Sequence, residues 1–239
     1  MPLWVLIGFL FLGSLLADRP PSTDSNEVSL WKQYARLGAV RDEGLQGTSG
    51  YYRLNRRTNL TFRDLRLFTY ALGKDSYIFL RYKSSNKYRR LSWLYNFTTL
   101  FYQRNTRANV SLRYHFNQGL GAFIHQSATG HITVEVGQAY DMSNYLNSDR
   151  KTSYLKTGLY WDQDLFRLST KWEAEYFYQI SEVVEANLTR TQLQGELLYS
   201  LGRGFSVIVG YELEYYSSNR RPESWYLELG WKQPLSWSL

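Results

Sequence analysis

The sequence contains no cysteine, so neither a disulfide bond nor a lipid-modified cysteine can hold or anchor this protein. Its fold must therefore rest on side-chain packing and backbone hydrogen bonds. After residue 17 no apolar run approaches the roughly 18 residues of a membrane helix, which excludes a membrane protein built from helices. The mean hydropathy of −0.44 does not exclude a membrane β-barrel, because lipid-facing and lumen-facing residues alternate and their hydropathies cancel.

Aromatic residues are abundant instead, with 21 Tyr, 12 Phe and 8 Trp. They recur in alternating stretches, of which residues 166–178, FRLSTKWEAEYFY, are the clearest example. Successive side chains of a strand point to opposite faces, so Trp172 and Tyr176 share one face while Lys171 and Glu173 share the other. The pattern predicts one strand that is long enough to cross a bilayer at a tilt.

The first residues predict export. Residues 1–17, MPLWVLIGFLFLGSLLA, have the apolar core and small-residue end of a signal peptide cleaved after Ala17, although no Lys or Arg precedes the core. Residues 18–43 are predicted to be a periplasmic leader or linker, with a short amphipathic helix or a plug in the barrel mouth as alternatives. Residues 44–239 are then the barrel domain.

From residue 44 onward turn residues separate about twelve strand candidates. They are residues 44–55, 59–72, 76–84, 88–96, 98–103, 107–126, 132–141, 151–161, 166–178, 187–201, 205–216 and 225–232. In hydrocarbon no edge strand can leave its backbone groups unpaired, so the last strand must pair with the first. The predicted fold is all-β, a closed antiparallel transmembrane β-barrel in the outer membrane of a diderm bacterium.

The faces of the later strands sort into an apolar set and a charged set. Trp, Tyr and Phe lie at the strand ends, as they do at the two lipid–water interfaces of a barrel, so the apolar face is predicted to face lipid. The charged face then lines the lumen. The predicted lumen-lining charges are Arg113, Glu135, Lys156, Arg167, Lys171, Glu173, Glu175, Arg190, Glu196, Glu212, Glu214 and Glu228.

An even number of strands returns both termini to the periplasmic side, which leaves the predicted external loops rich in Arg and Lys. Such a basic rim is suited to the phosphates of lipopolysaccharide, although ordinary solvated loops would look the same. The formal net charge of +7 is consistent with an anionic membrane surface, and no nucleic-acid partner is predicted for an exported protein. The predicted rim residues are Arg56, Arg57, Lys87, Arg90, Arg104, Arg107, Arg150, Lys151, Arg220 and Arg221.

Two glycine-containing stretches carry a resemblance to a known family. Residues 110–123, VSLRYHFNQGLGAF, contain Arg113 before Gly119 and Gly121, and residues 132–141, ITVEVGQAYD, contain a central Gly137. In this order of features the chain resembles the domain of unknown function 481 family of salt-induced outer-membrane proteins. The resemblance implies an outer-membrane β-barrel and no catalytic residues. Such barrels are recognised by the barrel-assembly machinery through a final aromatic residue, for which Trp237 is the candidate here.

One short motif offers catalytic chemistry. In residues 125–130, HQSATG, His125 and Ser127 lie two apart on one strand face, as in outer-membrane lipid hydrolases that use His to activate Ser, but Ala128 replaces the expected Asn. No metal-ligand spacing or cofactor motif is present in the sequence, so neither a metal nor a cofactor is predicted. The preferred interpretation is a non-enzymatic barrel, either a narrow small-solute pore or an envelope-stability protein. A lipid hydrolase and a soluble exported ligand-binding barrel are the alternatives.

Overall fold

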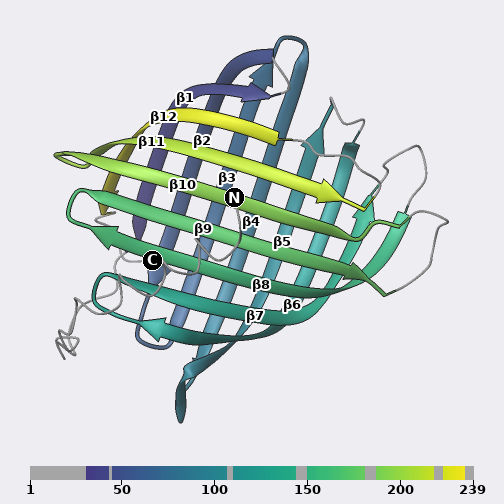
Figure 1. The fold of residues 1–239 in the computed structure, drawn as a ribbon, viewed down its shortest axis with the longest axis vertical. Helices are drawn as coiled ribbons and strands as arrows, with labels where there is room; N and C mark the ends of the chain where they lie inside the picture. The colour runs from purple at the N-terminus through teal and green to yellow at the C-terminus, as the bar shows by residue number, and fades with distance from the viewer. Residues whose placement is uncertain are drawn as a thin grey trace, which may run out of the picture.

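The computed structural model describes residues 31–42, 45–106, 110–143, 150–180, 187–217 and 223–234. Twelve antiparallel strands follow one another around a closed barrel, as Figure 1 shows. They are β1 (Lys32–Asp42), β2 (Leu45–Arg57), β3 (Thr61–Leu72), β4 (Asp75–Tyr88), β5 (Leu91–Asn105), β6 (Val110–Gln126), β7 (Gly130–Ser143), β8 (Arg150–Leu165), β9 (Leu168–Gln179), β10 (Arg190–Gly202), β11 (Phe205–Tyr216) and β12 (Glu223–Pro234).

The barrel closes between its first and last strands. β1 pairs with β2 on one side and with β12 on the other, over the whole length of the strand in both cases. No strand edge is therefore left unpaired in the described barrel, which confirms the predicted closed antiparallel architecture. Among the described residues no helix has both the length and the apolar character needed to cross a membrane.

The predicted leader was wrong for residues 32–42, which form β1. Its lumen-facing side chains include Tyr34 and Arg36, while Ala35 and Ala39 point outward. Two alanines give a weak apolar signal, and the strand exists because β2 and β12 both need a partner. The predicted signal peptide, residues 1–17, and residues 18–30 lie outside the described residues.

A second error concerns β5, and because it adds one strand to the prediction where the first error removed one, the predicted number of strands is still twelve. The predicted strands at residues 88–96 and 98–103 are one continuous strand, β5, which follows a turn at Arg89 and Arg90. β5 has Tyr95, Phe97 and Phe101 on its lumen face and Leu100 on its outer face, so its sequence lacks a clean alternation. Because one strand was missed and another was split, residues 45–88 run in the direction opposite to the predicted one.

The outer face of the barrel is apolar and its interior is charged. Leu197, Leu227 and Val136 are about half exposed on the outside, whereas Lys156, Glu228 and Arg190 are almost fully buried inside. A soluble barrel would have the reverse arrangement, so the soluble ligand-binding alternative was wrong. Aromatic side chains form a girdle at each end of this outer face, one of Tyr114, Tyr140, Tyr178, Tyr215 and Trp225 and the other of Tyr88, Trp93, Tyr199, Phe205 and Trp231.

The two ends of the barrel differ in their connections. We call the end at which β1 starts and β12 stops the terminus end. Its connections are tight, at residues 58–60, 89–90, 127–129, 166–167 and 203–204. At the opposite end, the loop end, the connections include the longer segments 106–109, 144–149, 180–189 and 217–222.

Candidate functional site: the charged lumen

Eleven of the twelve predicted lumen-lining charges lie on the lumen face, on β6 to β12. Arg167 does not, because β9 begins two residues later than predicted and Arg167 is exposed in the turn between β8 and β9. Sequence reasoning missed the lumenal charges of the early strands, since Asp64 and Arg66 share a face with Phe68 and obscured the register. The missed residues of these strands are Arg36, Arg53, Asp64, Arg66, Arg81 and Lys83, and Asp141 on β7 was missed as well.

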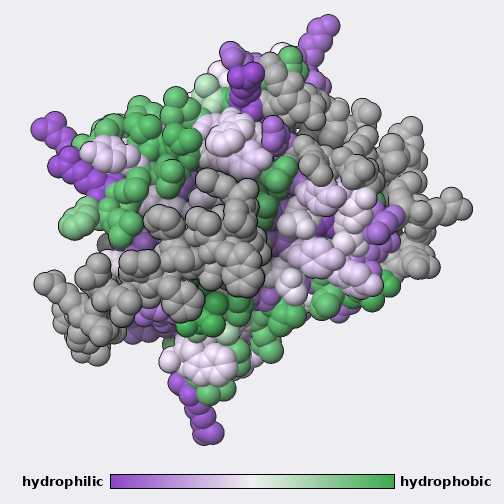
Figure 2. Space-filling model, viewed as in Figure 1, coloured by the Kyte–Doolittle hydropathy of each residue, from purple (hydrophilic) through white to green (hydrophobic). Residues whose placement is uncertain are grey.

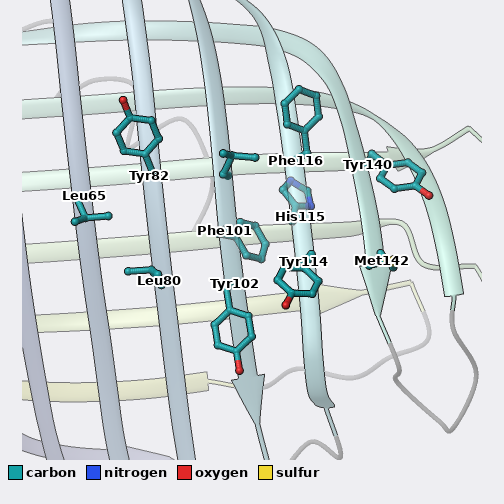
Figure 3. A pocket seen from close by; sticks show the side chains of 11 residues that line it. Leu65, Leu80, Tyr82, Phe101, Tyr102, Tyr114, His115, Phe116, Tyr140 and Met142 are labelled. Atoms are coloured by element: carbon teal, nitrogen blue, oxygen red, sulfur yellow. The ribbon is translucent and has the colours of Figure 1, made fainter.

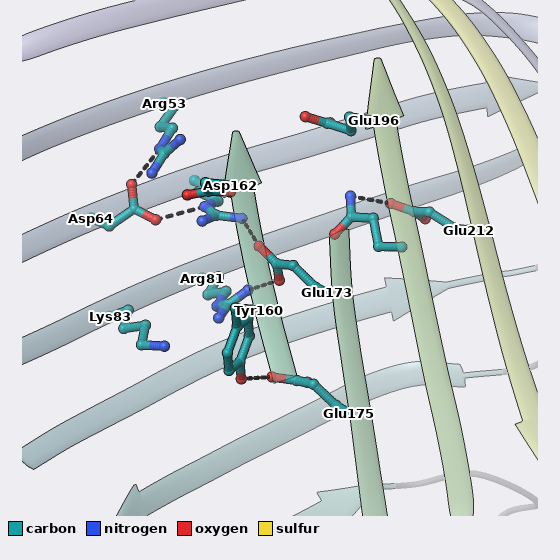
Figure 4. Close-up of polar contacts among 12 residues, drawn as sticks. Arg53, Asp64, Arg81, Lys83, Tyr160, Asp162, Glu173, Glu175, Glu196 and Glu212 are labelled. Atoms are coloured by element: carbon teal, nitrogen blue, oxygen red, sulfur yellow. Dashed lines mark hydrogen bonds and ion pairs between the residues drawn. The ribbon is translucent and has the colours of Figure 1, made fainter. Parts of the chain in front are cut away.

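A chain of ion pairs crosses the lumen from wall to wall. Asp64 on β3 accepts from Arg53 on β2 at 2.5 Å and from Arg66 at 2.6 Å. Arg66 then reaches Glu173 on β9 at 3.2 Å, and Arg81 on β4 reaches the other oxygen of Glu173 at 3.3 Å. In the strand order β3 and β9 are six strands apart in either direction, so this contact joins diametrically opposite walls (Figure 4).

A second cluster joins β4, β7, β8 and β9. Glu135 accepts from Lys83 at 2.5 Å and from Lys156 at 3.3 Å, and Lys156 also reaches Glu175 at 2.8 Å. The side chains of Glu135 and Lys156 have no exposed surface. Tyr160 hydrogen-bonds to Glu175 and accepts from Lys156, so a phenol joins the two charges.

A third cluster lies on β6, β7, β10 and β11. Arg113 binds Asp141 through two nitrogens, with the shortest contact at 2.7 Å, and Arg190 reaches Asp141 at 3.5 Å and Glu214 at 3.3 Å. The guanidinium of Arg190 also stacks 4.3 Å from the ring centre of Phe177. Such stacking shields the apolar side of a buried guanidinium while its edge binds carboxylates.

A fourth cluster joins β1 to β10 and β12. Arg36 binds both oxygens of Glu196, at 2.5 and 2.9 Å, and reaches Glu228 at 3.4 Å. Ser49 donates to the second oxygen of Glu228 at 2.7 Å. The carboxylates of this cluster are therefore held by one guanidinium and by hydroxyl groups, including that of Tyr226 at 2.8 Å from Glu196.

Two glycines make room for the tyrosines that serve these clusters. A Cβ on Gly210 would lie 2.0 Å from the ring of Tyr226, and one on Gly121 would lie 2.2 Å from the ring of Tyr95. The ring of each tyrosine packs against its glycine, and Tyr95 donates to Glu135 at 3.0 Å. β6 pairs regularly at Gly119 and Gly121, and its irregularities lie elsewhere.

The clusters divide the lumen into two walls of opposite charge. We call β1–β6 the cationic wall, because six basic residues on its lumen face form ion pairs, against the single buried carboxylate Asp64: Arg36, Arg53, Arg66, Arg81, Lys83 and Arg113. We call β9–β12 the anionic wall, because it carries Glu173, Glu175, Glu196, Glu212, Glu214 and Glu228. Two basic residues, Lys171 and Arg190, also lie on the anionic wall.

The predicted hydrolase pair is not assembled. Ser127 Oγ accepts from the backbone N–H of Gly130 and lies 3.1 Å from its carbonyl oxygen, so it caps the turn between β6 and β7. The side chain of His125 is exposed, and no hydrogen bond joins it to Ser127 within the described residues. The described residues also contain no group of three His, Cys, Asp or Glu side chains that could hold a metal ion.

The predicted basic rim was wrong as a single surface. Arg56, Arg57, Lys87 and Arg90 lie at the terminus end, since the direction of β2 and β4 is reversed relative to the prediction. Of the others, Arg104 and Lys151 are exposed at the loop end, and Arg150 begins β8 there. Arg107, Arg220 and Arg221 lie outside the described residues.

An apolar groove of about 370 Å³ runs over the outer face of β3–β7, toward the loop end (Figure 3). Leu80, Leu100 and Phe116 line it, and the hydroxyl groups of Tyr102 and Tyr114 point toward the loop end. Two exposed cations lie next to the groove. Arg104 follows Tyr102 on the same face of β5, and Lys151 is paired with the lining residue Met142.

Comparison with known proteins identifies solved structures with a similar fold but no family to which the chain belongs. No protein-family model matches the chain, and no curated protein does. Among solved structures the NanC porin superposes with a TM-score of 0.59 at 9% identity, covering 84% of this chain and 100% of that one. An outer membrane channel from Pseudomonas putida F1 superposes with a TM-score of 0.51 at 8% identity, covering 91% of this chain and 99% of that one. The chain has the fold of an outer-membrane porin barrel. Its resemblance to the domain of unknown function 481 family stays a prediction.

Proposed function

We propose that this protein is an outer-membrane β-barrel whose lumen is a narrow channel for small polar solutes, constricted by the Arg66–Glu173–Arg81 contact. Three observations support this proposal: the apolar outer face with its two aromatic girdles, the charged interior, and the porin fold. Tight turns are typical of the periplasmic side of such barrels and longer loops of the outer side, so the terminus end is assigned to the periplasm.

The contact at Glu173 carries the proposal because it bridges the full width of the lumen. One carboxylate, 18% exposed, holds two guanidinium groups that extend from the opposite wall. A solute that passes this level must move beside the bridge or displace it. Small polar solutes suit such a passage, since charged groups on both walls can replace part of their hydration.

Planar-bilayer recordings of the refolded chain test this function. We expect small, steady conductance steps for the natural sequence and steps at least several-fold larger for Glu173→Ala, because the bridge then lacks its shared carboxylate. Asp164→Asn, at an exposed position near the terminus end, is the matched control and should leave the steps unchanged. If neither the natural chain nor Glu173→Ala conducts, the barrel is a structural protein of the envelope and the channel proposal is wrong.

We also propose that the loop end contacts lipopolysaccharide, with an acyl chain in the apolar groove and a phosphate near Arg104 and Lys151. Charge complementarity supports this partner, because the groove itself is apolar and the two neighbouring side chains are exposed cations. Lipid A binding measured at two salt concentrations should weaken in Arg104→Gln/Lys151→Gln and should lose its salt dependence. Unchanged binding in this double variant would remove the partner from the proposal.

A further inference from the structure

Three hairpin tips at the terminus end share one composition. The β4–β5 tip has Arg89 and Arg90 between the exposed side chains of Tyr88 and Leu91. At the β10–β11 tip Arg203 follows Leu201, which is 53% exposed, and precedes Phe205, which is 44% exposed. Each tip thus joins arginine to large apolar side chains that have no cover within the barrel, and the proposed channel uses neither.

The third tip, between β8 and β9, adds backbone strain to this pattern. Phe166 is fully exposed and has a φ of +55°, in the left-handed region that favours glycine or asparagine. Leu165 and Leu168 beside it are 54% and 40% exposed. A strained and fully exposed phenylalanine stabilises nothing inside the barrel, which indicates that something outside the chain covers this tip.

The arginines of these tips are also free to bind an external anion. The side chains of Arg89, Arg90, Arg167 and Arg203 are exposed and form no ion pair or hydrogen bond among the described residues. The acidic side chains nearest to Arg167 in the sequence are Asp162 and Asp164, at the end of β8. Asp162 lies 3.5 Å from His131. Hydrophilic side chains project past hydrophobic patches where the β10–β11 and β4–β5 hairpins extend from the barrel (Figures 1 and 2).

We infer that these tips, which we call the Arg–aromatic tips (residues 88–93, 165–168 and 201–205), bind the headgroups of anionic phospholipid in the leaflet at the terminus end. Arginine pairs with phosphate through parallel N–H···O bonds, and aromatic rings rest between the headgroups and the acyl chains. Each tip has both an arginine and an aromatic ring.

The distribution of the tips favours a leaflet over a protein partner. The β4–β5 and β10–β11 tips lie on opposite sides of the strand order, with the β8–β9 tip between them. A leaflet surrounds the barrel and reaches all three tips at once, whereas one protein would have to encircle the barrel to do so. The inference rests on the barrel spanning a bilayer, but not on its conducting solutes.

Native mass spectrometry of the full chain, released from micelles that contain equal phosphatidylglycerol and phosphatidylethanolamine, tests this inference. We expect the natural chain to retain phosphatidylglycerol preferentially, because only that lipid carries a net negative charge. Replacing Arg89, Arg90, Arg167 and Arg203 by Gln should lower this preference at least tenfold. The control replaces two exposed cations of the loop end, Arg41 and Lys74, by Gln and should retain the preference.

Further measurements distinguish binding of a whole phospholipid from binding of a phosphate group alone. Added inorganic phosphate should compete only weakly, since it lacks the acyl chains that the rings contact. Phe166→Asn relieves the backbone strain, so it should stabilise the fold while it weakens lipid retention. Equal retention of both lipids by the natural chain, or an unchanged preference in the four-arginine variant, would overturn the inference. A chain absent from the membrane fraction would instead contradict the location on which the channel proposal depends.

Discussion

The cationic wall and the anionic wall of the lumen differ in how their charges are satisfied. Four of the six basic residues on the cationic wall reach a carboxylate of the anionic wall, through the pairs Arg36–Glu196, Arg66–Glu173, Arg81–Glu173 and Arg113–Glu214. On the anionic wall Glu212 has no basic partner among the described residues and accepts from Gln194 at 2.9 Å. The cationic wall is thus more completely neutralised than the anionic one.

This difference shows what holds the two halves of the barrel together in the lumen. Backbone pairing joins each strand only to its neighbours, whereas these four ion pairs join strands that are three to six positions apart in the strand order. A buried pair adds little net stability by itself, but removal of one partner leaves a buried charge uncompensated. The stability of a variant of either wall should therefore depend mainly on whether the substitution leaves a buried charge without a partner.

The largest effect is expected for Arg36→Ala. Arg36 is 4% exposed and is the cation for both Glu196 and Glu228, so its loss should lower the free energy of unfolding by about 3–5 kcal/mol. Urea unfolding in lipid vesicles, followed by tryptophan fluorescence, measures this loss. Arg41→Ala, at an exposed position on the same strand, is the control. Neutralising the stranded carboxylates with Glu196→Gln and Glu228→Gln should restore part of the stability, and a loss below about 1 kcal/mol would contradict the comparison.

The next effect compares the two faces of one strand on the anionic wall. Leu197 is 46% exposed on the outer face of β10, and an arginine there would face lipid, at a cost of about 2–4 kcal/mol near the bilayer midplane. Gln192→Arg on the lumen face of the same strand places the new charge beside Glu214 and should cost much less. The same unfolding measurement in vesicles compares them. Equal losses would mean that the outer face of β10 is not in lipid.

How far the sequence predicts these walls depends on whether a strand alternates cleanly. In β9 Trp172 and Tyr176 point outward while Glu173 and Glu175 point inward, as predicted, because the apolar and charged sets occupy separate faces. In β5 both faces are apolar, so period-two reasoning split the strand. β1 has too few large apolar residues to be predicted, and one of its two partners, β12, lies at the far end of the barrel sequence.

The partners across the lumen could not be predicted at all. Glu173 binds Arg66 and Arg81, which lie on the opposite wall and more than 90 residues away in the sequence. The sequence determines the face on which a charge lies, because that depends only on alternation. Its partner depends on the barrel radius and on the strand order, which is set by closure. The basic rim was misplaced for the same reason, since one missed strand reversed the direction of β2 and β4.

A smaller effect is expected where the anionic wall depends on a glycine. Gly210→Ala places a methyl group 2.0 Å from the ring of Tyr226, which must move away and thereby lose its hydrogen bond to Glu196. Such overpacking should cost about 1–3 kcal/mol in unfolding free energy. Gly50→Ala is the matched control, because its nearest neighbour would be 3.5 Å away. If both substitutions cost the same, the contact between Gly210 and Tyr226 is not what positions the tyrosine.

The smallest effect should have the opposite sign. Glu212 is repelled by the carboxylates of Glu196, Glu228, Glu173 and Glu214, and its described partner is the amide of Gln194. Glu212→Gln removes one like charge while it keeps the shape of the side chain, so at neutral pH it should raise the free energy of unfolding by up to about 1 kcal/mol. Glu214→Gln is the comparison, because Glu214 contacts Arg190 at 3.3 Å and its neutralisation should destabilise the barrel. Opposite signs for these neighbouring carboxylates would show that the anionic wall carries one charge more than its cations satisfy, and a loss of stability in both variants would show that Glu212 has a cation after all.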